Sequence, residues 1–239
     1  MPNYTVAAVL AGGKGTRFTS ETPKQFLPLG GKAVWQWSVE AFEKCSAVEA
    51  ILLVMPPDCV ETVREQAVAA GYKKVALVLA GGRERRDSTR CAIEACRNIC
   101  KGKGPVNLLL HDAARPLVSD GSIRRVIDAL QSAPAATAAV PVSDTIAAAD
   151  EAGRLCAVPP RSRLWQVQTP QGFHLPVLER AYERAARDPA FAATDDCGVV
   201  RRYLPEVPIQ LVPGDRRAYK LTYPEDLAVL EQWVHQKDR

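Results

Sequence analysis

A cluster of glycines directly follows the first apolar run of the chain. Residues 10–18 read Leu-Ala-Gly-Gly-Lys-Gly-Thr-Arg-Phe, and the cations Arg17 and Lys24 lie in and just after this loop. Glycine has no Cβ, so backbone amides in such a loop approach an anion closely. The glycine spacing matches neither the dinucleotide fingerprint nor the P-loop pattern. The loop therefore indicates a polyphosphate site, with an ordinary tight turn as the alternative.

A histidine and an aspartate follow a later apolar run, residues 106–110. Asp112 is expected at the end of that strand, and Mg²⁺ commonly takes one or two carboxylates, completing its octahedron with phosphate oxygens and water. Asp112 is thus the candidate metal ligand, and Mg²⁺ or another divalent cation the candidate cofactor. The alternatives for Asp112 are a cap or an ion pair with Arg115. His111 is expected to be structural, and we assign it no catalytic role.

The composition sets the scaffold that must position these groups. With 239 residues, 47% of them hydrophobic, the chain is expected to form one domain over residues 1–239 with a core of its own. The net charge of +4 is spread along the chain and is less than a dedicated nucleic-acid binder shows. No apolar run approaches the roughly 20 residues of a membrane span. We therefore expect a small phosphorylated substrate, and neither nucleic acid nor a membrane, as the partner.

The seven cysteines are odd in number and include no CxxC pair. This usage is typical of a reduced intracellular protein. The first residues, Met-Pro-Asn-Tyr-Thr, lack the basic start of a signal peptide. The expected location is the cytoplasm.

Apolar runs of strand length alternate with segments of helical period, which is the pattern of a parallel sheet with crossover helices. The predicted strands are residues 6–11, 50–55, 75–80, 106–110, 136–142 and 208–212. The predicted helices are residues 34–44, 60–70, 88–100, 122–131, 175–187, 195–203 and 224–235. The expected fold is therefore α/β, with a doubly wound, mostly parallel, Rossmann-like sheet that binds ligands beyond the carboxyl ends of its strands.

The alternation breaks in the segment 141–170. Residues 144–147 and 156–158 are predicted to pair as a hairpin around a turn at Gly153. The approximate subregion 141–168 is thus expected to protrude as a β-hairpin arm. Such an arm either lies on a partner subunit or closes as a lid, and we favour the first interpretation.

Six further motifs occur in order along the chain. They are GGRERRDS at 81–88, HDAARP at 111–116, DT at 144–145, Arg161 followed by LWQVQTPQ at 164–171, TDD at 194–196, and KLTYPEDL at 220–227. Together with the glycine loop, Arg17 and Lys24, they resemble the nucleotidyltransferase family of 2-C-methyl-D-erythritol 4-phosphate cytidylyltransferases over essentially the whole chain.

The resemblance implies transfer of CMP from CTP to a polyol phosphate in the non-mevalonate route to isoprenoid precursors. Pyrophosphate is the second product, and Mg²⁺ is the expected cofactor. The resemblance also implies a homodimer whose arms are exchanged between subunits. Nucleotidyl transfer depends mainly on positioning and charge neutralisation, and the sequence presents neither a catalytic triad nor a zinc cluster.

The resemblance also assigns roles to individual residues. Arg17 and Lys24 are expected to be catalytic. The residues expected to bind CTP, mainly through backbone groups, are Ala11, Gly12, Gly13, Gly15, Gly82, Arg83, Ser88 and Ala113. The residues expected to bind the acceptor are Arg115, Asp144, Thr145, Arg161, Thr169, Thr194 and Lys220. Judged from the residues alone, Ser88 or Asp87 is equally well a helix cap, and the threonines are caps or surface hydroxyls.

Three positions depart from the commoner family pattern. Pro160 stands where an Asp usually precedes the acceptor Arg, Ala218 where an Asn often lies, and Arg83 where some members have an Asp. None removes a proposed cation, but the first two change the surroundings that orient Arg161 and Lys220.

Two other functions remain open at this stage. A related enzyme that cytidylylates ribitol 5-phosphate shares the loop and the HDAARP segment, although the stretch 165–171 favours methylerythritol phosphate. A nucleotide-binding module without turnover is the more distant alternative. The presence of four cations, Arg17, Lys24, Arg161 and Lys220, together with Asp112 argues against a non-catalytic module.

Overall fold

The structure is a computed structural model that describes residues 3–12, 22–191 and 194–237. Its strands are β1 (Tyr4–Leu10), β2 (Pro28–Leu29), β3 (Lys32–Ala33), β4 (Ala50–Met55), β5 (Val75–Ala80), β6 (Val106–Asp112), β7 (Ala135–Pro141), β8 (Ala148–Ala149), β9 (Leu155–Ala157), β10 (Trp165–His174) and β11 (Ile209–Pro213). Its α-helices are α1 (Val34–Lys44), α2 (Val60–Ala69), α3 (Arg85–Ile99), α4 (Asp120–Ala129), α5 (Leu175–Ala185), α6 (Asp196–Tyr203) and α7 (Asp226–Lys237).

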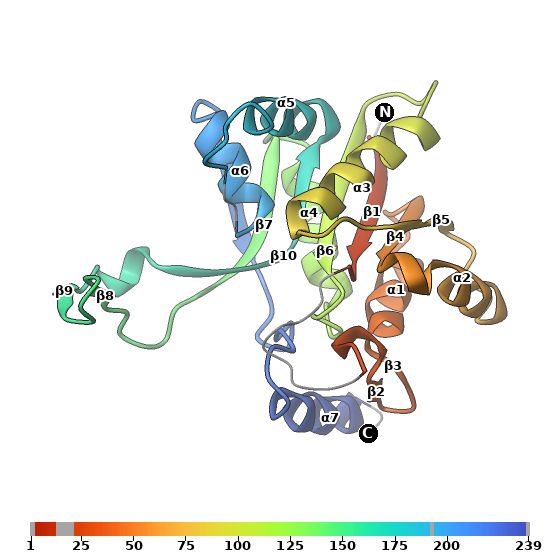
Figure 1. Ribbon diagram of the computed structural model, residues 1–239, viewed down its shortest axis with the longest axis horizontal. Coiled ribbons are helices and arrows are strands. Elements are labelled where there is room, and N and C mark those ends of the chain that lie inside the picture. The colour runs from red at the N-terminus through yellow and green to blue at the C-terminus, as the bar shows by residue number, and fades with distance from the viewer. Residues whose placement is uncertain (1–2, 13–21, 192–193, 238–239) are drawn as a thin grey trace.

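Seven strands form one sheet in the order β11-β7-β10-β6-β1-β4-β5 (Figure 1). Neighbouring strands are parallel except at β10, which runs antiparallel to both β6 and β7. The expected α/β fold with a mostly parallel sheet is confirmed.

Helices cover both faces of this sheet, as its almost continuously apolar strands predict. In β1, Val6 and Ala8 pack in a core with residues of α3, α5 and α6. The alternate residues Ala7 and Val9 pack in a second core with residues of α1, α2 and α4. All four are completely buried. A third, smaller cluster joins α7 to β2 beyond the strand ends.

Strand β10 is the main element that the sequence did not predict. Its residues include Gln166, Gln168, Pro170, Gln171 and Gly172, a composition that does not have the apolar pattern of a central strand. Each buried glutamine side chain of β10 has its own hydrogen-bond partner. Gln168 donates to Asp215 O at 2.9 Å, and Gln171 accepts from the backbone N–H groups that open α6.

Helix α3 begins three residues earlier than predicted. It starts at Arg85, and the Asp87 carboxylate accepts a hydrogen bond from the backbone N–H of Glu84 at 3.1 Å. Ser88 therefore lies inside the first turn and is not the cap. The prediction that Ser88 opens this helix is wrong. The first turn consists of charged residues that follow a Gly-Gly pair, so it lacks the apolar period by which the helix was predicted.

The segment between β7 and β10 extends away from the body as an arm (Figure 1). Near its end β8 pairs with β9, and Gly153 in the connecting turn has a φ of +76°, a conformation that glycine adopts without strain. The hairpin was predicted, but its first strand is β8 rather than residues 144–147. Within the described ranges, no helix is long and apolar enough to cross a membrane.

Candidate active site

Loops from the carboxyl ends of the central strands meet at one edge of the sheet, where open α/β sheets bind ligands. Ala11 N–H donates to Val54 O at 2.8 Å, and Ala113 N–H donates to Leu10 O at 3.0 Å. These bonds extend the parallel pairing into the loops. They border a cavity of about 140 Å³ lined by Leu10, Ala11, Gly12, Lys24, Gln25, Arg85, Ser88, Asp112, Ala113, Ala114 and Lys220. Seven of the residues predicted to act in the site therefore line this one cavity.

The Ser88 hydroxyl packs against the two glycine loops. A Cβ on Gly81 would lie 2.6 Å from Ser88 Oγ, and one on Gly12 would lie 3.0 Å from it. A Cβ on Gly82 would collide with the side chain of Asp87. Side chains at these glycines would thus push apart the loop after β5 and the start of α3. Ser88 lines the cavity, and its role in binding CTP stays a prediction.

Asp112 is contacted from three directions. Its Oδ2 accepts from Lys220 Nζ at 2.7 Å, and its Oδ1 lies 3.3 Å from Arg85 Nε. Its backbone N–H donates to Thr169 Oγ1 at 3.2 Å. Burial alone would raise the pKa of the Asp112 carboxyl, but the charges of Arg85 and Lys220 hold it well below its usual range. The carboxylate is therefore ionised and fixed in orientation.

His111 lies directly behind this carboxylate and is completely buried. Its Nδ1 is 2.9 Å from Thr169 Oγ1, and its Nε2 is 3.1 Å from the backbone oxygen of Arg115. Burial lowers the pKa of His111 to about 4. The ring is thus a neutral structural group that holds Thr169 and the loop after β6, as expected from the sequence. Thr169 in turn is buried and bonded to the backbone of Asp112.

Lys24 reaches the cavity from the short helical turn Lys24–Phe26. Its Nζ donates to the backbone oxygen of Leu221 at 3.1 Å, next to Lys220. The neighbouring Gln25 is buried, and its Nε2 donates to Ala11 O at 2.7 Å. Gln25 thus ties the segment of Lys24 to the end of β1. The sequence motif contained Gln25, but its spacing gave no sign of this tie.

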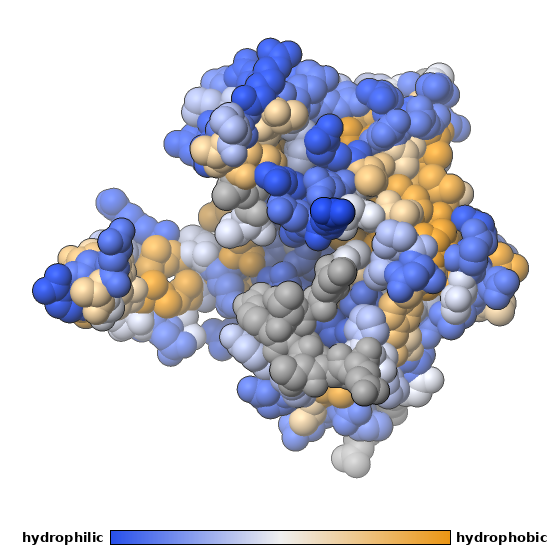
Figure 2. Space-filling model, viewed as in Figure 1, coloured by the Kyte–Doolittle hydropathy of each residue, from blue (hydrophilic) through white to orange (hydrophobic). Residues whose placement is uncertain are grey.

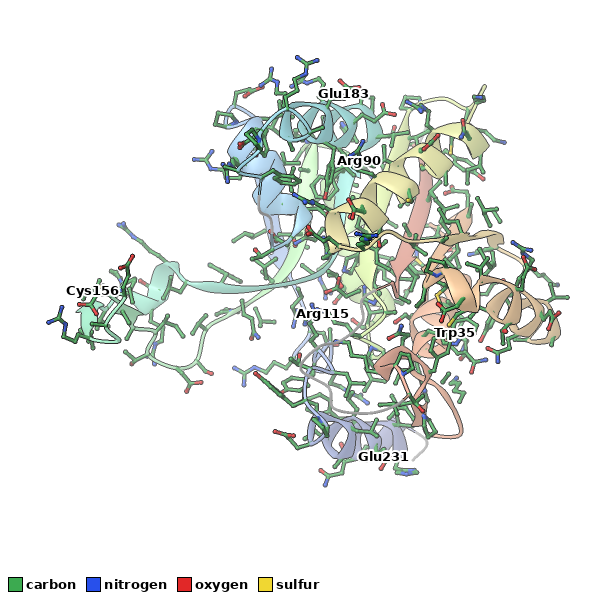
Figure 3. The ribbon with its side chains drawn as sticks, in the orientation of Figure 1. Trp35, Arg90, Arg115, Cys156, Glu183 and Glu231 are labelled. Atoms are coloured by element: carbon green, nitrogen blue, oxygen red, sulfur yellow. The ribbon has the colours of Figure 1, made fainter. Side chains whose placement is uncertain are left out.

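Arg115 lies between the sheet and the C-terminal segment (Figure 3) and is buried. Its Nη1 donates to Ala218 O at 2.8 Å and its Nη2 to Val167 O at 3.4 Å. Its Nε is buried without a hydrogen-bond partner in the described parts of the chain. Burial lowers the pKa of Arg115, while the nearby Asp112 charge opposes that effect. The guanidinium therefore holds the loop that carries Lys220 against β10.

A second cavity of about 710 Å³ adjoins the first, and Lys220 and Arg115 line it together with Asp144. Thr145 and Arg161 lie on the exposed arm, and Arg161 Nη1 donates to Ser143 O at 2.9 Å. Neither of them is among the described residues that line either cavity.

The remaining predicted residues line neither cavity or lie outside the residues that the structure describes. Thr194 is exposed and directly precedes Asp195, whose carboxylate caps α6. Arg83 is exposed in the loop after β5 and lines neither cavity. Gly13, Gly15 and Arg17 lie outside the described residues. Their expected roles stay predictions.

Arg85 is the charged residue of the cavity that the assignment of roles missed. It lies within the quoted motif at 81–88, among three arginines of similar spacing, so the sequence did not distinguish it. The structure does, because Arg85 contacts Asp112 and also Asp196, 111 residues away along the chain.

Known proteins resemble this chain over nearly its whole length. Residues 5–236 match the family model described as IspD, 2-C-methyl-D-erythritol 4-phosphate cytidylyltransferase. The chain is 43% identical over 229 residues to the protein of that name from Thermobifida fusca, covering 94% of this chain and 91% of the relative. It is 34% identical to the one from Syntrophus aciditrophicus, covering 100% and 99%.

Solved structures show the same likeness. The 2-C-methyl-D-erythritol 4-phosphate cytidylyltransferase of Thermus thermophilus has a TM-score of 0.74 at 32% identity, covering 98% of this chain and 99% of that one. The 4-diphosphocytidyl-2C-methyl-D-erythritol synthase of Anaerococcus prevotii has a TM-score of 0.84 at 21% identity, covering 98% and 96%, and supports the fold. Because the family model matches residues 5–236 and these relatives are 34–43% identical over nearly the whole chain, this chain belongs to the 2-C-methyl-D-erythritol 4-phosphate cytidylyltransferase (IspD) family.

Proposed function

We propose that this chain transfers CMP from CTP to 2-C-methyl-D-erythritol 4-phosphate, giving 4-diphosphocytidyl-2-C-methyl-D-erythritol and pyrophosphate in the non-mevalonate pathway. One observation carries the proposal beyond family membership. Lys24, Asp112 and Lys220, which are far apart in the sequence, line one cavity at the carboxyl ends of the central strands.

In this reaction an oxygen of the acceptor phosphate attacks the α-phosphorus of CTP. The bond from that phosphorus to the bridging oxygen breaks, and pyrophosphate leaves with the electron pair. Lys24, and Arg17 by family resemblance, neutralise the charge that builds on the phosphate oxygens. The cytosine is held on the side of the cavity formed by the loops at Gly12 and Gly82 and by Ser88. No protein nucleophile is needed, because the acceptor supplies it.

The proposed cofactor is Mg²⁺, held by Asp112. The described residues contain no group of three or more His, Cys, Asp or Glu that could cage a metal ion. A single ionised carboxylate beside a phosphate site still fits Mg²⁺, because this ion takes most of its other ligands from substrate phosphates and water. The bound ion would neutralise phosphate charge, and Asp112 would fix its place.

The proposed assembly is a homodimer in which each arm completes the partner's acceptor site. The arm leaves apolar side chains exposed in the single chain, among them Ile146 at 45%, Leu155 at 67% and Val158 at 52% (Figure 2). Arg161 and Thr145, which resemble acceptor-binding residues, lie on that same arm. Sedimentation should give a dimer for the wild type and a monomer when the hairpin tip, residues 146–158, is replaced by a short Gly-Ser turn. A monomeric wild type would contradict the assembly.

The cysteine usage supports a reduced compartment, and we propose the cytoplasm as the location. Localisation of a fluorescent fusion tests this directly. Signal spread through the cytoplasm is expected, and signal confined to the envelope would contradict it.

The function is tested by pyrophosphate release from CTP and Mg²⁺ with one of two acceptors, 2-C-methyl-D-erythritol 4-phosphate or ribitol 5-phosphate, and with no acceptor. Release with the first acceptor alone is expected. A preference for ribitol 5-phosphate would keep the roles at the phosphate end but replace the acceptor. Binding of CTP without release in any condition would support the non-catalytic module instead.

A further inference from the structure

A series of ion pairs with alternating charges runs from the cavity into the core behind it. Lys220 bonds to Asp112, Asp112 to Arg85, and Arg85 Nη1 bonds to Asp196 Oδ2 at 2.5 Å. Arg85 thus bridges two carboxylates with different atoms of one guanidinium. Its side chain is 25% exposed, whereas that of Asp196 is completely buried.

At the inner end of this series of ion pairs, Asp196 has several hydrogen-bond partners. Asp196 Oδ1 accepts from Tyr182 OH at 2.6 Å and from Thr89 Oγ1 at 2.9 Å. Its backbone N–H donates to Gln171 Oε1 at 3.0 Å. Helices α3 and α5 therefore hold this carboxylate, and strand β10 holds the backbone of Asp196 at the start of α6. Asp196 in turn fixes Arg85.

We propose that Arg85 is a positioning residue that aligns Asp112 for the transfer reaction by anchoring it to Asp196. This inference rests on the proposed function. Arg85 opens α3 directly after the loop of Gly81 and Gly82, so the same residue also fixes the base side of the cavity relative to the carboxylate. A lysine carries the same charge, but its single ammonium group lacks the planar fork that addresses two carboxylates in fixed directions.

Two single variants at Arg85 and one control test the role in turnover. Arg85→Gln and Arg85→Lys should each lower kcat about 10- to 100-fold, the range for groups that orient a metal ligand. The Mg²⁺ concentration that gives the half-maximal rate should rise, which a smaller folded fraction would not cause. Arg90→Gln is the matched control, because Arg90 is exposed on the same helix. Wild-type kcat in Arg85→Lys would overturn the proposal, since charge without the bridge would then suffice.

A double variant separates positioning from simple stabilisation. Arg85→Gln leaves the buried Asp196 charge unpaired, so its thermal unfolding midpoint should fall. Adding Asp196→Asn removes that charge, so the unfolding midpoint should recover most of the loss. The kcat of the double variant should stay within about threefold of that of Arg85→Gln, because Asp112 is still not anchored. Recovery of kcat together with the midpoint would overturn the proposal. A wild type that releases no pyrophosphate would instead overturn the proposed function.

Discussion

The strand-end cavity and the arm differ in how their functional side chains are held. Asp112 is 13% exposed and receives contacts from Arg85, Lys220 and Thr169, which come from three other segments of the chain. Arg161 is exposed, and its hydrogen bond goes to Ser143 of the same arm. The phosphate end of the site is therefore organised within one chain. The side chain of Arg161 has no comparable contact with the body among the described residues.

This difference shows where stability and function coincide. At the strand ends, the groups proposed to position the chemistry also cross-link the core, so substitutions there should affect both stability and function. On the arm they are separable, because few contacts of the body depend on it.

Lys24→Ala should have the largest effect on turnover. Loss of one well-aimed donor lowers kcat about 10²- to 10³-fold, or roughly 3–4 kcal/mol, with a smaller change in KM for CTP. Steady-state kinetics measure both constants. Lys101→Ala, at an exposed lysine after α3, should behave like the wild type. A kcat for Lys24→Ala close to that of the wild type would remove Lys24 from the catalytic machinery.

Leu108→Ala in β6 should lower the free energy of unfolding by about 2–5 kcal/mol, because it opens a cavity in a fully buried core. Leu155→Ala on the arm should change it by less than about 0.5 kcal/mol, provided that the protein is dilute enough to keep the arm unpaired. Denaturant unfolding compares the two variants. Equal losses would mean that the arm belongs to the same cooperative core.

A mixing experiment tests whether the two regions meet across subunits. Lys24→Ala and Arg161→Ala should each be nearly inactive, yet mixed and re-equilibrated dimers should regain about a quarter of wild-type activity, since half of the random dimers then hold one intact site. Lys24→Ala mixed with Asp112→Asn should regain none, because both changes lie at the same end. Failure of the first mixture to regain activity would place the arm on its own chain's site.

The smallest effect is a pH dependence of stability from His111. Its folded pKa of about 4 lies below its ordinary value of 6.5, so the unfolded chain binds more protons between these values. Stability should be constant above pH 6.5 on this account and fall by at most about 1.4 kcal/mol per pH unit as the pH drops toward 4. Denaturant unfolding of the wild type and His111→Gln should differ in this slope, and equal slopes would contradict the assignment.

The sequence predicted much of the fold because the information was local. The runs at 50–55 and 75–80 are apolar along their full length and form β4 and β5 with the predicted bounds. Strand β10 failed for the opposite reason, since its glutamines become acceptable in a central strand only through partners near Asp215 and Asp196. The organisation of residues 1–239 as one domain stays a prediction.

The candidate site divides in the same way. Residue type and position suggested Lys24 and Asp112, because phosphate chemistry requires cations and a carboxylate, and the family resemblance added Ser88 and Lys220. All four line the strand-end cavity, and their roles stay predictions. The sequence could not single out Arg85 from Arg83 and Arg86, since these arginines look alike along the chain. The tertiary structure distinguishes them, because Arg85 bridges two carboxylates that the packing of α6 on α3 and β10 brings together. A contact between residues so distant in sequence exists only once the layers have assembled.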